Sequence, residues 1–462
     1  MKGEDEYQDL DRYQDVLGQL PMLQAYSHIL YFFPAPPEVP KEQIIRDLEK
    51  AITKVRKMVP WMGARVINVG KQPGNSGLYR PIKCPLPEKA IDVVEASGTS
   101  GVVTYKLIGE RKAPLALIDT DLLTPVVGYP NKYDDSDEHP AHVVRLQATF
   151  IPGGVIVCFA LEHNMGDAGG HFGFVKLIAI AMCGEEFPAD LLAQANYDRR
   201  RAVPLLEEHE PMLDHSHHRR PAITSSTPLA PASSKYARYH VFRFTAAAMA
   251  GLKELASQPE GFNKGVAFIS TDDAVCAFCW QRLILARFKR GRFPAETQSR
   301  FGRQIDGRPA LGLPPNYMGD VAHTVSAWMT FGALASAPLA TIASCLRARL
   351  NETHDLYHIR SFATFIAQEP DKSTITYAGK FNPDVDVGCS SIRGLRGVFP
   401  EFGVLGRPEF IRRPPSVPFP STLVLFPGTP EGDCDAVLCL TDADFETLMA
   451  DEEWRNAVEY IG

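Results

Sequence analysis

The clearest hydrophobic pattern in this chain lies between residues 144 and 161. Every second residue from Val144 to Phe150 is apolar, which is typical of a strand with one buried face. After a turn at residues 152–154, residues 155–161 form an unbroken apolar run, as in a strand buried on both faces. The pattern predicts a hairpin in the middle of a sheet.

Apolar residues at helical spacing lie on both sides of this hairpin. A strand-like segment at residues 25–33 is followed by apolar side chains at positions 45, 48, 52 and 55, and Pro60 then ends the predicted helix. Beyond the hairpin, apolar side chains recur at positions 172, 175, 179 and 182. We therefore expect one helix before the hairpin and one after it.

The second half of the chain alternates strand and helix signals in the same way. Residues 239–244 resemble a strand, and Ser270 precedes apolar positions at helical spacing up to Leu285, which predicts a capped helix. Residues 306–320 are rich in Pro and Gly and predict a turn before another apolar strand. Strand and helix signals therefore alternate in both predicted halves.

A segment rich in Pro, Ser and Thr separates the two halves and is typical of a linker. Because 462 residues exceed what a single hydrophobic core holds, we expect two domains. The predicted boundaries are 1–205 for the N-terminal domain, 206–238 for a crossover linker and 239–462 for the C-terminal domain.

The charge and the longest apolar runs limit the partners of the protein. A formal net charge of −7 gives no electrostatic reason to bind nucleic acid or anionic membrane. The N-terminus is acidic and lacks the apolar core of a secretory signal, and residues 155–161 and 174–183 fall short of the ~20 residues that span a bilayer. We expect a cytoplasmic protein without nucleic acid or membrane as a partner.

The cysteines and clustered histidines do not predict a metal site. Nine cysteines lack paired spacing, and Cys276 and Cys279 have no second pair at zinc-ligand distance, so we expect buried free thiols. His215, His217 and His218 lie in the polar linker, where neighbouring histidines more often carry no chemistry.

One motif, His163-Asn-Met-Gly-Asp167, stands between the second hairpin strand and the Gly-rich start of the next helix. A histidine can accept and return a proton at neutral pH because its usual pKa lies near 6.5, so the motif points to acyl transfer. A surface histidine beside a helix-capping aspartate fits the same five residues. Asp167 either orients the imidazole or shapes the loop by pairing with an arginine, and both roles remain open.

Together with other segments this motif resembles the BAHD superfamily of coenzyme A-dependent acyltransferases, in particular its fungal branch with the trichothecene O-acetyltransferases. Asp306-Gly-Arg308 and Tyr317-Met-Gly-Asp320 are similar to the D-x-R and Y-F-G-N segments of the family. Residues 401–408 are similar to its D-F-G-W-G-K-P signature, although Glu401 replaces the aspartate and the loop is one residue longer. The resemblance extends over nearly the whole chain.

The resemblance implies an α/β (α+β) fold of two chloramphenicol-acetyltransferase-like domains, each with a mixed sheet flanked by helices. A channel runs between the domains, with His163 at its centre. Acetyl-CoA or another acyl-CoA is then a co-substrate, with no permanently bound cofactor, and a small-molecule alcohol or amine is the acceptor. The enzyme is expected to be a monomer that acylates a hydroxyl of a fungal-type secondary metabolite, with His163 as general base and no covalent enzyme intermediate. The absence of a G-x-S-x-G nucleophile motif agrees with that mechanism.

The resemblance also assigns further site residues. Expected coenzyme A contacts are Ser270, Thr271, Ser391 and Arg393. Residues expected at the acceptor are Tyr26, His28, Tyr31, His171 and Trp328. Structural residues are Arg308, Glu401, Phe402 and Gly403, with Glu401 paired to Arg308. Ordinary capping for Ser270 and Thr271, and core packing for the aromatic residues, fit the sequence as well. Backbone amides near residues 166–170, or Ser390 and Ser391, are candidate donors to the oxyanion.

Two other functions fit parts of this pattern. A peptide-synthesis condensation domain shares the expected fold, but it places a second histidine directly before the first, where this chain has Glu162. A catalytically idle homologue that only binds a ligand is the other alternative, and the presence of both His163 and Asp167 argues against it.

Overall fold

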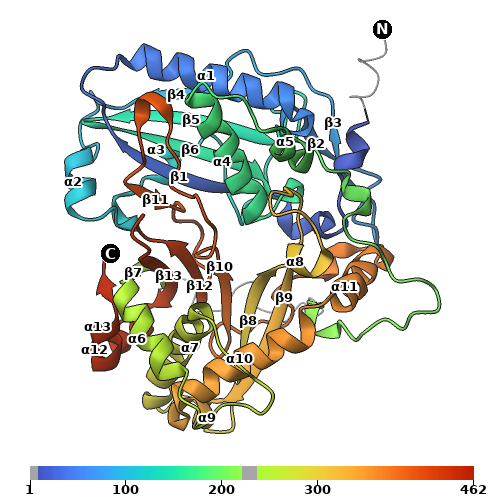
Figure 1. The fold of residues 1–462 in the computed structure, drawn as a ribbon, viewed down its shortest axis with the longest axis vertical. Coiled ribbons are helices and arrows are strands. Elements are labelled where there is room, and N and C mark those ends of the chain that lie inside the picture. Colours follow the sequence, from blue (N-terminus) through green and yellow to red (C-terminus); the bar gives the residue numbers. More distant parts are fainter. Residues whose placement is uncertain (1–8, 221–236) are drawn as a thin grey trace.

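The computed structural model describes residues 9–220 and 237–462 and contains two large sheets, one in each half of the molecule (Figure 1). The first sheet has the strand order β11 (Phe410–Arg412), β1 (Tyr26–Pro34), β6 (Gly154–Glu162), β5 (Val144–Ile151) and β4 (Asp92–Glu95). The second has the order β14 (Glu459–Tyr460), β7 (Ala237–Phe244), β13 (Cys434–Thr441), β12 (Thr422–Pro427), β10 (Val387–Ser391), β8 (Gln298–Asp306) and β9 (Ala322–Thr330). Strands β2 (Arg65–Val69) and β3 (Leu78–Ile82) form a small third sheet.

Both large sheets contain parallel and antiparallel pairs, as predicted. In the first, β4 runs parallel to β5 and the other neighbours are antiparallel. In the second, β10 is parallel to both β8 and β12. The helices of the first half are α1 (Lys41–Met58), α2 (Tyr105–Glu110), α3 (Thr120–Leu123), α4 (Ala168–Met182) and α5 (Ala189–Ala195). Those of the second are α6 (Ala246–Ala256), α7 (Thr271–Lys289), α8 (Arg308–Leu311), α9 (Phe331–Ser336), α10 (Leu339–Thr353), α11 (Leu356–Gln368), α12 (Asp442–Ala450) and α13 (Glu452–Ala457).

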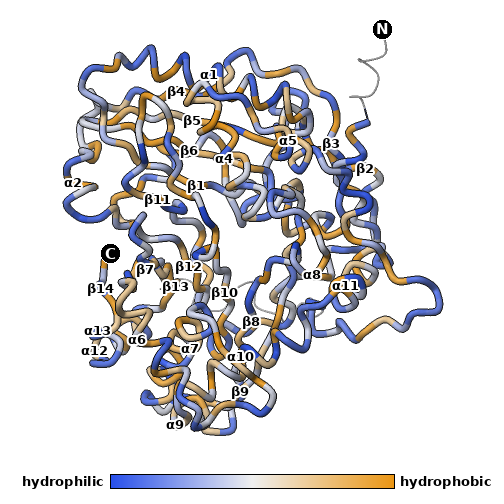
Figure 2. Tube along the Cα trace, in the orientation of Figure 1, coloured by the Kyte–Doolittle hydropathy of each residue, from blue (hydrophilic) through white to orange (hydrophobic). Residues whose placement is uncertain are grey.

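The predicted hairpin is confirmed as β5 and β6, in the interior of the first sheet. All nine residues of β6 are buried, which explains why its sequence is apolar on both faces. Gly153 turns the chain with φ of +82°, a conformation that favours glycine. The predicted helices on either side are confirmed as α1 and α4, which pack against each other. Figure 2 shows hydrophobic segments along β5, β6 and α4 and an alternating pattern along α1.

The second half is built around α7, whose predicted cap is confirmed. The Ser270 hydroxyl accepts the amide of Asp273 at 3.1 Å, and the Asp273 carboxylate accepts the amide of Ser270 at 2.8 Å. This reciprocal capping box satisfies two amide groups that a helix start otherwise leaves free. Buried side chains then cover most of α7, which packs against α6, α9 and α10.

Two features join the halves more closely than the predicted boundaries suggest. Strand β11 comes from the C-terminal part of the chain but pairs with β1, with Leu30 opposite Arg412. A separate apolar cluster also brings Leu17 and Leu20 of the N-terminal segment against Ile359 and Phe362 of α11. Of the predicted linker, residues 221–236 lie outside the described residues.

None of the described helices is long and apolar enough to cross a membrane. All nine cysteines are free. Within residues 9–220 and 237–462 no group of three or more His, Cys, Asp or Glu side chains is arranged to hold a metal. The His215 ring instead contacts the Ser361 hydroxyl at 2.9 Å and packs against Phe362 and Phe365.

Candidate active site

The His163 loop, residues 163–167, leaves the end of β6 and enters α4. The backbone amide of His163 donates to the carbonyl of Ala25 at 2.8 Å, so the loop begins as an extension of the sheet. Its far end passes close to a second loop, residues 317–320. A Cβ atom at Gly166 would lie 2.7 Å from the carbonyl oxygen of Met318, and one at Gly170 only 2.3 Å from it. Glycine is therefore required where the two loops meet.

Asp167 is bonded to the second half of the molecule and makes no hydrogen bond to the imidazole of His163 among the described residues. Its carboxylate accepts Arg308 Nη2 at 2.7 Å and Nη1 at 3.0 Å, and both side chains are more than nine-tenths buried. It also caps α4 through the amide of Gly170 and accepts the amide of Val321. Burial alone raises the pKa of Asp167, but Arg308 and these hydrogen bonds outweigh it and lower the pKa below its usual value.

The expected pairing of Glu401 with Arg308 is wrong. Glu401 is exposed, and its carboxylate lies 3.3 Å from Arg407 Nε. The other members of that segment do pack as structural residues. The Phe402 ring contacts Phe33 and Phe159 in the core. Gly403 has φ of +54°, and a Cβ there would lie 2.3 Å from a backbone oxygen of Met182.

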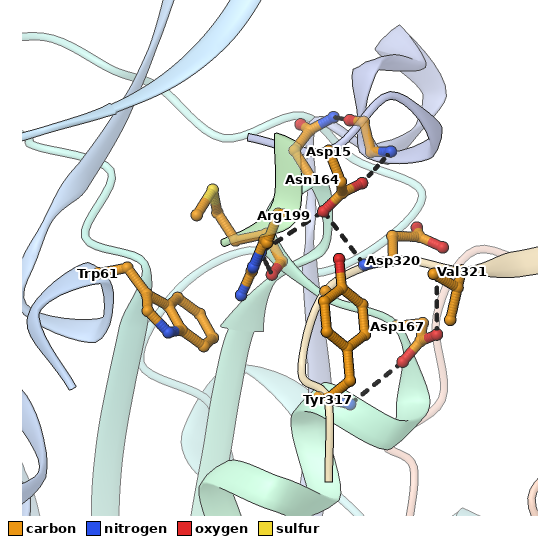
Figure 3. A network of polar contacts seen from close by, with 12 residues as sticks. Asp15, Trp61, Asn164, Asp167, Arg199, Tyr317, Asp320 and Val321 are labelled. Carbon is orange, nitrogen blue, oxygen red and sulfur yellow. Dashed lines mark hydrogen bonds and ion pairs between the residues drawn. The ribbon is translucent and has the colours of Figure 1, made fainter. Parts of the chain in front are cut away.

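The N-terminal segment and Arg199 also contact the His163 loop (Figure 3). The Asn164 side-chain amide donates to the carbonyls of Gly18 and Leu20. Arg199 donates to the carbonyl of Met165 at 2.6 Å and lies 3.5 Å from Asp15. No local sequence pattern marks these contacts, because each joins residues more than 30 positions apart and depends on burial.

The surroundings of His163 favour the neutral form of its imidazole. Burial lowers the pKa of the imidazole, and the positive charge of Arg413 lowers it further. The Nδ1 atom is buried and has no hydrogen-bond partner among the described residues, which leaves Nε2 as the nitrogen available to a substrate. A neutral imidazole at neutral pH is the form that accepts a proton.

A cavity of about 350 Å³ lies between the two halves, and His163 lines it. Its wall includes residues from both large sheets and from the loops between them. Among them are His163, Asp167, Arg308, Asp320, Tyr377, Ser391 and Arg413. The volume is in the range of binding sites for small organic ligands.

The four residues expected to contact coenzyme A occupy different places. Ser391 lines the cavity, and its hydroxyl donates to Asp272 at 2.5 Å. Thr271 and Arg393 line a second hollow, which they share with Lys253 beside α6. The side chain of Ser270 serves the α7 capping box.

Two of the five residues expected at the acceptor line a third hollow, which adjoins the cavity. Tyr26 and His28 face it together with Arg413, because residues two apart on a strand point to the same side. The His28 Nε2 atom is buried and has no partner among the described residues. Burial lowers the pKa of His28 to about 4, so its ring is neutral.

For the other three residues the expectation needs correction. Tyr31 points to the opposite side of β1, is fully buried and donates its hydroxyl to the carbonyl of Val398. The ring nitrogens of His171 contact the Ser27 hydroxyl at 2.9 Å and the carbonyl of Phe159 at 3.1 Å. Trp328 is 45% exposed on the edge strand β9, away from the cavity.

Comparison with known proteins places this arrangement in a family. Residues 115–454 match the model of the Transferase family, and residues 25–183 match the trichothecene 3-O-acetyltransferase-like N-terminal domain. The O-acetyltransferase epaC of Aspergillus niger is 53% identical over 459 residues, which cover 99% of this chain and 98% of that protein. The O-acyltransferase pigD of Monascus ruber is 43% identical over 459 residues, or 98% of this chain and 100% of that protein.

A crystal structure of F. graminearum TRI101 complexed with coenzyme A and T-2 mycotoxin is similar to this one. Its TM-score is 0.88 at 28% sequence identity, and the match covers 97% of this chain and 99% of that chain. This similarity confirms the expected fold class. From the extent of these matches and the motifs in its sequence, the chain belongs to the Transferase family, the BAHD acyltransferases, and is itself an acyltransferase.

Proposed function

We propose that the protein transfers an acyl group, in the first place acetyl, from acyl-CoA to a hydroxyl of a small secondary metabolite, with His163 as general base. The observation that carries this proposal is the position of His163. Its neutral ring lies in a cavity between the two halves of the molecule, in a chain that is 53% identical to an O-acetyltransferase.

The chemistry requires one proton to move twice. His163 takes the proton from the acceptor hydroxyl as its oxygen attacks the carbonyl carbon of the thioester, which gives a tetrahedral intermediate. The carbon–sulfur bond then breaks, and the imidazolium returns the proton to the thiolate of coenzyme A. The products are an ester and free coenzyme A. General base catalysis of this kind contributes about 10²- to 10⁴-fold to the rate.

Asp167 has a structural role in this proposal. Its two oxygens are used by Arg308, Gly170 and Val321, so it fixes the loop and the start of α4. Electrostatics also favour this role, because a carboxylate neutralised by a buried arginine raises the pKa of the neighbouring imidazole less than a free one.

The donor and the acceptor reach His163 from different hollows. Arg393 and Lys253 beside α6 supply positive charge for the phosphates of coenzyme A, with Thr271 nearby and Ser391 inside the cavity. The hollow lined by Tyr26, His28 and Arg413 then receives the acceptor. The similar F. graminearum TRI101 was crystallised with coenzyme A and T-2 mycotoxin together, which supports a site for two substrates.

The test supplies acetyl-, malonyl- and longer acyl-CoA with a panel of small alcohols and amines and detects the acylated product by mass spectrometry. We expect an ester with at least one alcohol, and a loss of about 10²- to 10⁴-fold in kcat for His163→Ala. Arg407→Gln, in an exposed ion pair remote from the cavity, is the matched control and should keep the parent rate. Product formed by His163→Ala at the parent rate would refute the role of His163.

A further inference from the structure

Arg413 lies where the cavity at His163 meets the hollow that Tyr26 and His28 line. Tyr129 and residues 413–416 belong to the walls of both spaces. The hollow has a volume of about 390 Å³, which is in the range of binding sites for small organic ligands. A molecule that extends from the hollow to His163 therefore runs past Arg413.

The residue before it, Arg412, is fully paired and fixes the end of β11. Its Nη1 atom lies 2.8 Å from the carboxylate of Asp435, and its other nitrogens donate to the carbonyls of Ala113 and Lys112. Arg412 is also buried. Arg413 therefore leaves the sheet from a backbone position that its neighbour holds in place.

Arg413 itself makes no ion pair or hydrogen bond among the described residues. Its guanidinium lies over the ring of Tyr129, 5.6 Å from the centroid. The side chain is partly exposed, and none of its nitrogens belongs to the buried unpaired atoms of the described residues, so they keep surface that a ligand can reach. An arginine offers five N–H groups in a planar fork, and here the protein uses none of them.

The other polar groups of the hollow do not supply a positive charge. The hydroxyls of Tyr26, Thr120 and Thr124 each donate to a backbone carbonyl at 2.9 Å or less. Asp121 is exposed and makes no ion pair with Arg413. The wall also contains two neutral polar side chains, Asn131 and Ser416. Positive charge on this wall therefore comes from Arg413.

The arginines elsewhere on the cavity wall have acid partners. Arg308 Nη2 lies 2.7 Å from the carboxylate of Asp167, and Arg300 Nη2 lies 3.8 Å from that of Asp386. Among the described residues that line the cavity or the hollow, Arg413 is thus the one arginine or lysine without an acid partner. Partly buried cations are usually paired, so this position suits an anion from a ligand.

We propose that Arg413 binds an anionic oxygen of the acceptor, a carboxylate or an ionised enol, and so selects acceptors that carry this acid group in addition to the reacting hydroxyl. The inference rests on the proposed acyl transfer and defines its substrate class. The arginine fork matches the oxygens of such a group, and a site that excludes part of the water strengthens the ion pair. The anion does not react, so proton transfer still runs through His163.

The test compares matched small ligands, one anionic and one neutral, and needs no acyl transfer. Naphthoate is paired with naphthamide, and dimedone, an acidic enol, with its neutral enol methyl ether. Isothermal titration at neutral pH with saturating coenzyme A measures the dissociation constants. Because hydrogen bonds between charged groups are stronger than neutral ones, we expect the anion to bind about 10- to 100-fold more tightly in at least one pair.

The pair that shows the preference identifies the acid group as a carboxylate or an enol. Equal binding within both pairs would overturn the inference, and this comparison in the parent protein requires no variant. Arg413→Gln removes the charge and should bring each pair to within a few-fold. Arg413→Lys keeps the charge without the planar fork and should retain an intermediate preference.

The matched control is Arg220→Gln. Burial raises the pKa of Tyr129, and both Arg413 and Arg220 offset part of that rise, but Arg220 is exposed and lines neither the cavity nor the hollow. Arg220→Gln should therefore keep the parent preference. If the preference persists in Arg413→Gln, or if Arg220→Gln lowers it as much, Arg413 is not the anion site.

An anion could also come from the acyl donor, because Arg413 lines the cavity as well as the hollow. Malonyl-CoA carries a carboxylate that acetyl-CoA lacks. If Arg413→Gln changes the ratio of kcat/KM for these two donors and leaves the binding of naphthoate unchanged, the site serves the donor and the inference is wrong. Acyl transfer itself is tested separately through His163→Ala. Failure of the proposed function and failure of this inference are therefore distinguishable.

Discussion

The His163 loop and the wall of the adjoining hollow, lined by Tyr26, His28 and Arg413, differ in how their polar groups are satisfied. In the loop, Asn164, the backbone of Met165 and Asp167 are each bonded to a different part of the chain. In the wall, Arg413 makes no ion pair or hydrogen bond among the described residues and lies over the ring of Tyr129, while His28 Nε2 has no partner there.

In the proposed function, this difference separates the part of the site that performs chemistry from the part that selects a substrate. A general base must be fixed to within a fraction of an ångström, since a displacement of about 1 Å can cost 10²-fold in rate. Polar groups that recognise a substrate must instead keep their hydrogen-bonding capacity free for it. Relatives with different acceptors are therefore expected to differ in the wall more than in the loop.

The largest effect should follow from Asp167→Asn, which breaks the buried pair with Arg308. Removing one partner leaves an uncompensated buried charge, which costs about 3–5 kcal/mol of unfolding free energy. Urea denaturation followed by fluorescence measures this loss. The control is Asp306→Asn, because Asp306 also contacts Arg308 at 2.8 Å but is half exposed. An equal loss for both variants would mean that burial does not decide the strength of the pair.

Asn164→Ala should loosen the loop without removing a charge. The carbonyls of Gly18 and Leu20 lose their partner in a buried place, and an unsatisfied buried group costs about 1–3 kcal/mol. We expect kcat to fall by up to about 10²-fold because His163 shifts, while the KM for acyl-CoA changes little. If KM rises and kcat is unchanged, the loop does not depend on this anchor.

Arg413→Gln tests whether the charge of Arg413 lowers the pKa of His163, the proposed general base. In the proposed mechanism the neutral form of His163 accepts the proton, so kcat/KM should fall as the pH decreases through the pKa of His163. Burial lowers that pKa below the usual value of about 6.5. The charge of Arg413 contributes to that lowering, so its removal should move the acidic limb to higher pH. Arg413→Lys keeps a positive charge and should leave the limb in place. An unmoved limb in Arg413→Gln would exclude this electrostatic effect.

The smallest effect is expected for Glu401→Gln, because its ion pair with Arg407 is more than half exposed on both sides. Exposed pairs contribute about 0–1 kcal/mol, so thermal denaturation should barely change and kcat should match the parent. A loss comparable with that of Asp167→Asn would show that the segment at residues 401–408 depends on this acid.

Several parts of the fold and the site could be predicted because their cause is local. The hairpin of β5 and β6 follows from a period of two and an unbroken apolar run, and the cap of α7 follows from Ser270 and Asp273 three residues apart. The side of β1 on which each residue lies could also be predicted in part. Tyr26 and His28 share one side of the strand, and the same rule of alternation puts Tyr31 on the other side.

Other features depend on which segments meet. The sequence shows that Glu401 and Arg308 are charged, but the tertiary structure decides that Arg308 pairs with Asp167 and that Glu401 stays exposed. Asp15 and Arg199 carry no signal of their own, because a charged group becomes unusual only when burial removes its water and its neighbours are assembled.

The sequence by itself determined the hairpin of buried strands, the positions of the main helices and the placement of His163 at the end of a buried strand. These depend on the spacing of apolar residues and on capping groups within a few positions of one another. Only the tertiary structure decided which acid is paired and which side chains face the cavity. Pairing and access depend on contacts between segments that can be more than 300 residues apart, and the pattern along the chain does not encode those contacts locally.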